Sequence, residues 1–190
     1  CTEDADGLRM QSCISPVWDT ALTALALLDS GTPEDHPRLR VVSSWLVRNQ
    51  VLTGGDWQVN VCCPPGGWAF EFCNTQYPDV DDSAVVLHAL RRLNPTPDGT
   101  LQCAQTRGME WCLSMQSKCG GWAAFDKDNT MMVLNRIPFA DQEAMVDYPS
   151  ADVTGRVLEA MGLYGYDKTH PRAARAIRFL RSIQEPDGCW

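Results

Sequence analysis

Residues 111–122 read Trp-Cys-Leu-Ser-Met-Gln-Ser-Lys-Cys-Gly-Gly-Trp, and two further segments of the chain end in a similar way. One runs from Trp45 to Gln50 and continues to Gly54-Gly55-Asp56-Trp57. The other runs from Phe179 to Gln184 and continues to Gly188-Cys189-Trp190. The three glutamines lie 66 and then 68 positions apart. Similarity at such a fixed spacing is the signature of a repeat architecture.

Each repeat is predicted to hold two helices of different character. The first is apolar on nearly every face, which is typical of a buried helix, and the second is amphipathic with basic residues, which is typical of an outer helix. The expected inner helices are Trp18–Leu28, Asp81–Leu93 and Asp152–Leu163, and the expected outer helices are 37–50, 102–116 and 171–184. No segment shows convincing strand alternation. Repeated inner and outer pairs form either a solenoid or a closed barrel, and we predict an all-α fold, a partial α/α barrel (an α-α toroid).

The composition excludes several classes of protein. The 190 residues suffice for one domain with a substantial core. A net charge of -8 argues against a nucleic-acid partner, which normally meets a basic surface. No segment approaches the roughly 20 apolar residues of a transmembrane helix. The nine cysteines and three histidines show no ligand-like spacing, so no metal site is predicted. Because the chain begins at Cys1 without Met, we expect an internal piece of a longer protein.

Three carboxyl groups crowd into the run Asp79-Val80-Asp81-Asp82, immediately before an apolar stretch. Like charges a few ångströms apart raise at least one pKa, and a carboxyl group that keeps its proton near neutral pH can act as a general acid. The alternative is structural, because Asp before an apolar run is often a helix N-cap. Aligning Thr20, Ser83 and Thr154 places Asp82 in the capping position. The same alignment brings Trp18, Asp81 and Asp152 to one end of the inner layer, so Asp81 and Asp79 are predicted to face a cavity.

These motifs resemble a known family. The Gln, Gly and Trp endings are similar to the QW repeats of triterpene cyclases, and Asp79-Val80-Asp81-Asp82 matches their DxDD motif. The chain resembles the squalene–hopene cyclase family throughout, most closely in segments 15–20, 66–72, 77–83, 121–126 and 150–154. The resemblance implies protonation-initiated polycyclisation of squalene to hopene- or hopanol-type pentacyclic products, with no cofactor. It also implies that residues 1–190 are part of one catalytic α/α-barrel domain and are inactive in isolation.

The resemblance further implies roles for the acidic residues. Asp81 is the expected proton donor, while Asp79 and Asp82 hold its geometry and bias its proton. Asp152 and Arg156 complete the catalytic set, and Arg156 stands where the family carries a His. A cation there stabilises the conjugate base of the acid, although Arg cannot easily shuttle a proton. The alternative is that Arg156 merely pairs with Asp152, one helical turn away.

Aromatic residues are expected to line the substrate cavity, because their faces stabilise carbocations. The expected substrate-binding residues are Trp18, Phe70, Trp122, Phe125, Phe139 and Asp147. Phe125 stands where the family often has Tyr, and Phe139 is interpreted as a gate. For Trp122, packing between repeats is an equal alternative, and Trp57 and Trp190 are assigned to packing alone.

Two other functions fit parts of the pattern. One is a class II diterpene-type cyclase, which uses the same acid chemistry, and the other is a non-catalytic α/α-barrel binding scaffold. The Asp spacing does not match the DDxxD pattern of magnesium-dependent terpene synthases, so no metal requirement is expected. The predicted partners are squalene and a membrane surface, with peripheral, monotopic association on the cytoplasmic side, and the prediction includes a homodimer.

Overall fold

The computed structural model describes residues 2–4, 7–9, 14–72, 74–94, 98–129 and 146–190. Within these ranges the α-helices are α1 (Pro16–Asp29), α2 (Pro37–Arg48), α3 (Val80–Leu93), α4 (Gly99–Ser114), α5 (Ala151–Leu163) and α6 (Pro171–Ile183). A 3-10 helix, η1, spans Asp56–Val59. The antiparallel hairpin of β1 (Thr2–Asp4) and β2 (Gly7–Arg9) departs from the strand-free prediction, because three-residue strands are too short to show alternation.

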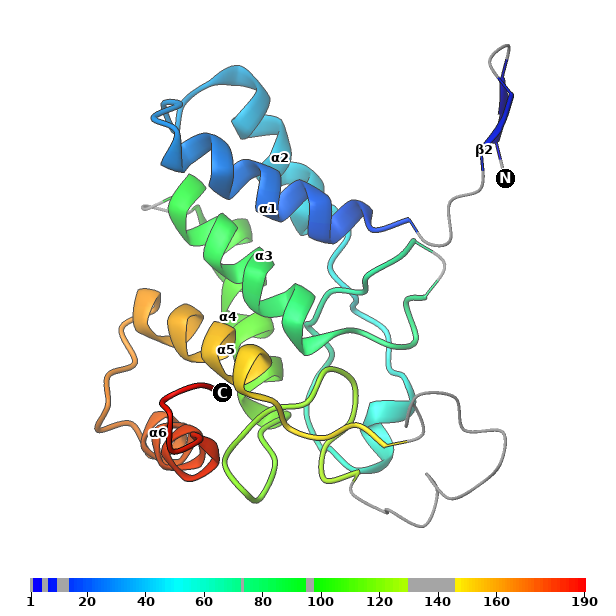
Figure 1. Cartoon of the computed structure of the whole chain (residues 1–190). Coiled ribbons are helices and arrows are strands. Elements are labelled where there is room, and N and C mark those ends of the chain that lie inside the picture. The colour runs from blue at the N-terminus through cyan, green and yellow to red at the C-terminus, as the bar shows by residue number, and fades with distance from the viewer. Residues whose placement is uncertain (1, 5–6, 10–13, 73, 95–97, 130–145) are drawn as a thin grey trace.

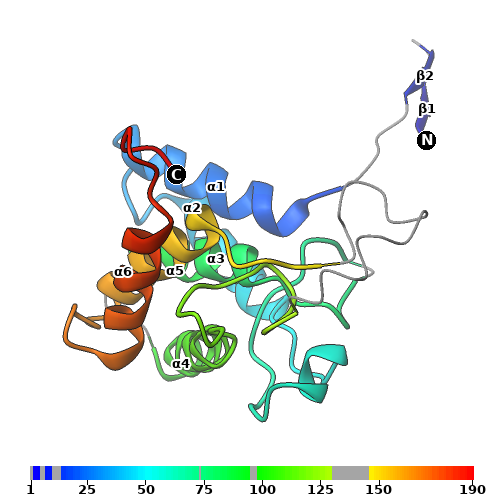
Figure 2. The ribbon, with the colours of Figure 1, turned by 60° about the horizontal axis from the view of Figure 1, so that its bottom comes forward.

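The helices form the predicted inner and outer layers (Figure 1). α3 lies between α1 and α5 and packs against both, and the three helices start at the same end of the layer. α2, α4 and α6 each pack against the inner helix that precedes them in the chain. Figure 2 shows α4 and α6 outside α3 and α5, and the hairpin apart from the helices. None of the helices in the described ranges combines the length and apolar character needed to cross a membrane.

Burial depends on the position of a helix pair in the chain as well as on its layer. The central inner helix, α3, buries ten of its fourteen residues, including two polar ones, Asp82 and Ser83. Its outer partner α4 buries eight of sixteen, whereas α1, α2 and α6, which belong to the first and last pairs, bury three each. Proline at the first turn of α2 and α6 suits their starts, since an N–H there has no partner within the helix.

The repeat endings make the same contacts three times. The indole N–H groups of Trp68, Trp122 and Trp190 donate to the carbonyls of Leu46, Cys112 and Leu180, over 2.7 to 2.8 Å. The first ending is therefore completed by Trp68, so the prediction that Trp57 ends this repeat was wrong, whereas its predicted packing role is confirmed. An insertion between Gln50 and Gly66 carries η1, where Trp57 is buried with its ring edge-on to Trp111.

The glutamines connect successive outer helices. Gln50 Nε2 donates to the carbonyls of Gly66 and Ala104, and its Oε1 accepts from Arg107. Gln116 repeats the pattern with the carbonyls of Gly120 and Arg172 and with the guanidinium of Arg175. Each side chain thus ties its own repeat ending to the next outer helix with charge-assisted and neutral hydrogen bonds.

The tryptophan loops are also tied to the starts of the inner helices. The backbone N–H of Trp68 donates to Ser83 Oγ over 2.8 Å, and that of Trp122 donates to Thr154 Oγ1 over 3.0 Å. Isolated bridges join Trp68 to Asp79 and Trp122 to Ser150. The repeat endings therefore hold the N-terminal turns of α3 and α5 in place, and the acid cluster sits in the first of these turns.

Candidate active site

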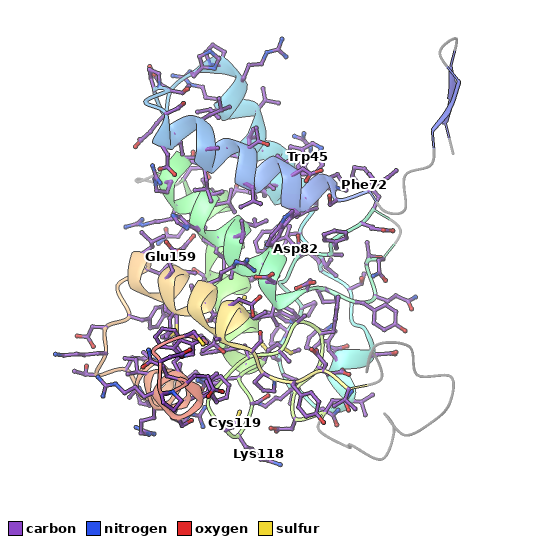
Figure 3. The ribbon with its side chains drawn as sticks, in the orientation of Figure 1. Trp45, Phe72, Asp82, Lys118, Cys119 and Glu159 are labelled. Carbon is purple, nitrogen blue, oxygen red and sulfur yellow. The ribbon has the colours of Figure 1, made fainter. Side chains whose placement is uncertain are left out.

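Asp79 caps the helix that carries the acid cluster. It has extended backbone angles, and its Oδ1 accepts the backbone N–H of Asp81 over 2.7 Å. The prediction that Asp82 occupies the capping position is therefore wrong, because α3 begins at Val80 and Asp82 belongs to its first turn. Asp82 is 1% exposed, and its Oδ1 has no hydrogen-bond partner among the described residues. Figure 3 shows Asp82 near the start of α3.

Burial makes two of the three acids weak. Desolvation raises the pKa of Asp79 to about 7, and the charges of Asp81 and Asp147 add to the effect. Desolvation also raises the pKa of Asp82 to about 8, with further contributions from Asp79 and Asp81. Loss of water is the first cause in both, and like-charge repulsion, the cause expected from the sequence, comes after it. Both groups therefore titrate near neutral pH, and Asp82 holds its proton to the higher pH.

Asp81 forms an ion pair with Arg156 of α5. Arg156 Nη1 donates to both carboxylate oxygens of Asp81. The Asp81 side chain is 19% exposed and that of Arg156 is 36% exposed, so the pair is accessible at the surface of this chain. The guanidinium carbon of Arg156 also lies 5.0 Å from the ring centroid of Trp18. Side chains from α1, α3 and α5 thus meet at the N-terminal end of the inner layer.

Asp152 is not brought into this contact. It is exposed and lines a separate pocket with Ala151, Leu180 and Trp190. Its pKa is lowered mainly by a hydrogen bond from Ser150, and the charge of Arg156 is the weakest of the causes. Within the described ranges the ion pair of Arg156 is with Asp81, which contradicts the alternative of a simple Arg156–Asp152 pair.

Asp147 organises the loop that follows Trp122. Its carboxylate accepts the backbone N–H groups of Ala124, Phe125 and Asp126, over 3.2, 2.6 and 2.7 Å. The carbonyl of Ala124 in turn accepts the N–H of Val80, over 2.7 Å, at the first residue of α3. Asp147 therefore supports the acid cluster through one loop, and its contribution to the pKa of Asp79 agrees with a position near the site.

The aromatic residues expected to line a cavity occupy different environments. Phe125 is 40% exposed, and Phe70 and Trp18 are partly buried. Trp122 is completely buried by the repeat packing, so the structure agrees with the packing alternative and not with the substrate-binding one. Phe139 lies outside the described residues.

A pocket of about 320 Å³ opens between the three inner helices, beside the ion pair. Leu22 and Leu25 of α1 and Val85 of α3 give it apolar walls, and Arg156 lies on its α5 side. Glu159, labelled on α5 in Figure 3, also lines this pocket, and its Oε2 atom lies 3.5 Å from Nδ1 of His88, another lining residue. In the part of the chain that the structure describes, no group of three His, Cys, Asp or Glu side chains is placed to hold a metal ion.

Trp68 and Ser83 had no predicted role in the site, although both support it. The signal was present, because Gly66-Gly67-Trp68 matches Gly120-Gly121-Trp122 more closely than Gly54-Gly55-Asp56-Trp57 does. Ser83 also aligns with Thr154, and both hydroxyl groups accept a tryptophan N–H.

Paired helices joined by repeated glutamine and tryptophan contacts define an α/α-toroid protein with QW-type repeats. Comparison with known proteins agrees: residues 14–190 match the model of the squalene–hopene cyclase C-terminal domain. The chain belongs to the squalene–hopene cyclase family.

Individual relatives cover nearly all of this chain. It is 46% identical to the squalene–hopene cyclase of Alicyclobacillus acidocaldarius over 98% of its own length and 30% of the relative. It is 43% identical to that of Zymomonas mobilis over 95% of its length and 28% of the relative. It is also 47% identical to a dammaradiene synthase of Dryopteris crassirhizoma, over 99% of its length and 29% of the relative. The chain thus spans less than a third of the length of these relatives.

Proposed function

We propose that this chain supplies the acid site of a class II triterpene cyclase that converts squalene into hopene- or hopanol-type pentacyclic products. The observation that carries the proposal is the cluster at the start of α3, where the buried Asp79 and Asp82 flank Asp81, which is paired with Arg156 of α5. A carbon–carbon double bond is a very weak base, so the donor needs a stabilised conjugate base as well as a proton, and Arg156 beside Asp81 supplies that stabilisation.

In the proposed mechanism a proton held by the cluster passes to Asp81, which delivers it to the less substituted carbon of a terminal double bond of squalene. A C–H bond forms, the π bond breaks, and the adjacent carbon becomes a tertiary cation that the next double bond attacks. Arg156 stabilises the carboxylate that Asp81 leaves behind. Because Arg156 keeps its own proton, Asp81 regains its proton through Asp79, Asp82 or water. Loss of a proton or capture of water ends the sequence of ring closures.

The aromatic residues near the site have a role in the later steps. Cations are attracted to aromatic faces, and water would quench them. Phe125 is held by the Asp147 loop, and Phe70 lies on the connection from Trp68 to the acid cluster. We assign both to the cavity wall. The missing hydroxyl group of Phe125, relative to the Tyr common in the family, is proposed to affect the product distribution rather than the first step.

The direct test is Asp81→Asn in the intact protein, assayed with squalene. Removing the proton donor should lower kcat by about 10²–10⁴-fold, the range of general acid catalysis. The matched control is Asp98→Asn at the N-cap of α4, where the Asp98 side chain accepts the N–H of Leu101. Asn caps as well as Asp, so this control should keep full activity. Polycyclic product formed by Asp81→Asn at the wild-type rate would contradict the assignment.

The proposed substrate and product classes are supported by the relatives, which are named squalene–hopene cyclases and a dammaradiene synthase. Triterpene chemistry is therefore favoured over the diterpene-type cyclase, and the buried acid cluster is unnecessary in a binding scaffold. Mass spectrometry of the products from squalene would distinguish hopene, hopanol and dammaradiene. Residues 1–190 alone should show no turnover, because the site lacks the remaining walls of the barrel.

Two further parts of the proposal concern the surroundings of the protein. Squalene is an apolar hydrocarbon that partitions into bilayers, and this supports peripheral association of the intact enzyme with a membrane. The cytoplasmic side is proposed from the family resemblance alone. Flotation with phospholipid vesicles would test the association, and recovery of all protein in the soluble fraction would contradict it. The homodimer is a separate proposal that sedimentation of the intact protein would test.

A further inference from the structure

We propose that Trp18 is a positioning residue for the acid: its indole face holds the Arg156 guanidinium, which in turn holds Asp81. The three side chains come from α1, α5 and α3, the three inner helices. The catalytic part of this inference rests on the proposed cyclase function, while its structural part stands on the contacts alone.

The contacts form a continuous series from the core to the reacting carboxyl group. Trp18 is partly buried and packs against the main hydrophobic cluster, which restrains its ring. The guanidinium carbon of Arg156 lies 5.0 Å from the centroid of that ring, inside the range of a cation–π interaction. The same guanidinium donates to both carboxylate oxygens of Asp81.

Arginine is suited to this double contact. Its guanidinium is planar, so one face can stack on an indole ring while its N–H groups point at a carboxylate in the plane. In this pair one nitrogen, Nη1, donates to both carboxylate oxygens while the guanidinium carbon lies over the ring, and a lysine ammonium group has no face to stack in this way. The side chain of Arg156 is 36% exposed. Without the Trp18 ring it would sample many rotamers, and only some of them would place the guanidinium against Asp81.

This arrangement changes the interpretation of Trp18. The sequence suggested a wall residue that contacts the substrate, but a face of its ring already interacts with a protein cation. A wall residue would affect substrate binding directly. A residue that acts through Arg156 and Asp81 affects proton transfer, so it changes kcat and leaves KM nearly unchanged.

A double-mutant cycle in the intact protein separates the two roles. Trp18→Leu should lower kcat about tenfold, the effect of losing one partly desolvated cation–π contact, with KM for squalene changed by less than about twofold. Trp18→Phe, which keeps an aromatic face, should recover most of the loss. In an Arg156→Met background, Trp18→Leu should lower kcat by less than about twofold, because there is no guanidinium left to hold.

The control is Trp45→Leu on the outer helix α2, where the partly buried Trp45 lies edge-on to Phe72, 6.1 Å between ring centroids (Figure 3). It removes a similar aromatic area, so it should lower stability without any coupling to Arg156→Met. Equal losses from Trp18→Leu in both Arg156 backgrounds, or a rise in KM at constant kcat, would overturn the proposal.

Crystal structures keep this inference separate from the cyclase assignment. In Trp18→Leu the Arg156 side chain should leave Asp81 or lose its ordered density, whereas in Trp18→Phe it should stay. An unchanged Arg156–Asp81 pair in Trp18→Leu would refute the positioning role even if the protein proved to be a cyclase. If the wild type gave no product from squalene, the cyclase proposal would fail and the structures would still decide the role of Trp18.

Discussion

Trp68 and Ser83 join the repeat packing to the acid cluster. The backbone N–H of Trp68 donates to Ser83 Oγ over 2.8 Å, while its indole N–H donates to the carbonyl of Leu46 over 2.7 Å. Ser83 follows Asp82 directly in the first turn of α3, and its hydroxyl group donates to the carbonyl of Asp79. One tryptophan thus connects an outer helix with the turn that carries all three acids.

Ser83→Ala should destabilise the protein by about 1–3 kcal/mol, because the buried N–H of Trp68 would lose its partner. Denaturant unfolding of the intact protein measures this change. Ser44→Ala, at an exposed position of α2, is the control and should stay within about 0.5 kcal/mol of the wild type. Equal stabilities of the two variants would show that the hydrogen bond does not matter.

Gln116→Leu should cost about 2–4 kcal/mol of unfolding free energy, because it strands the carbonyls of Gly120 and Arg172 and removes the partner of Arg175. Gln116 is 1% exposed, so the stranded groups could not turn to water. The control is Gln102→Leu, at an exposed position of α4, which should stay within about 0.5 kcal/mol of the wild type. A loss from Gln102→Leu as large as that from Gln116→Leu, in thermal unfolding, would argue against the bridging role.

Gly108→Ala should lower the free energy of unfolding by about 1–3 kcal/mol, because it disturbs the packing of α4 against Trp68. A Cβ atom there would lie 2.6 Å from Trp68 Cζ3, a buried ring that cannot move away. Gly162→Ala on α5 meets no atom within 4 Å and should stabilise the helix by about 0.5–1 kcal/mol. The two midpoints in denaturant should therefore move in opposite directions, and a shift in the same direction would refute the packing argument.

The free energy of unfolding of Asp82→Asn, relative to that of the wild type, should increase as the pH rises. The pKa of Asp82 is raised from 3.8 to about 8 in the folded protein, so between these values the folded state binds more protons than the unfolded state. Wild-type stability therefore falls with rising pH, by up to about 1.4 kcal/mol per pH unit, and Asn removes this slope. Unfolding at several pH values between about 5 and 8 tests it, and a pH-independent difference would contradict the buried titration.

The helices were predictable because their signals are local. The expected inner helices Asp81–Leu93 and Asp152–Leu163 agree with α3 and α5 to within one residue at each end. Apolar residues on every face indicated the inner layer, and basic amphipathic segments indicated the outer layer. The contacts of α3 with α1 and α5 confirm this order.

The errors arose where the sequence offers two similar choices. Gly-Asp-Trp at residues 55–57 lies closer to Gln50 than Gly67-Trp68 does, and only the bond from Trp68 to Leu46 shows which tryptophan completes the repeat. The cap was misplaced for a similar reason. A run with Asp at 79, 81 and 82 has several positions that could cap a helix, and the backbone decides that Asp79 does so.

The amino-acid sequence alone established the repeat, the helix pairs and the acid cluster, because periodicity and short motifs are properties of neighbouring positions. Tertiary structure alone decided which carboxyl groups are desolvated and which one meets a cation. Arg156 lies 75 positions from Asp81 along the chain, yet α3 and α5 pack side by side, so its guanidinium reaches Asp81 and leaves Asp152 exposed. Burial and charge pairing depend on which helices pack together, and this information is not local to any motif.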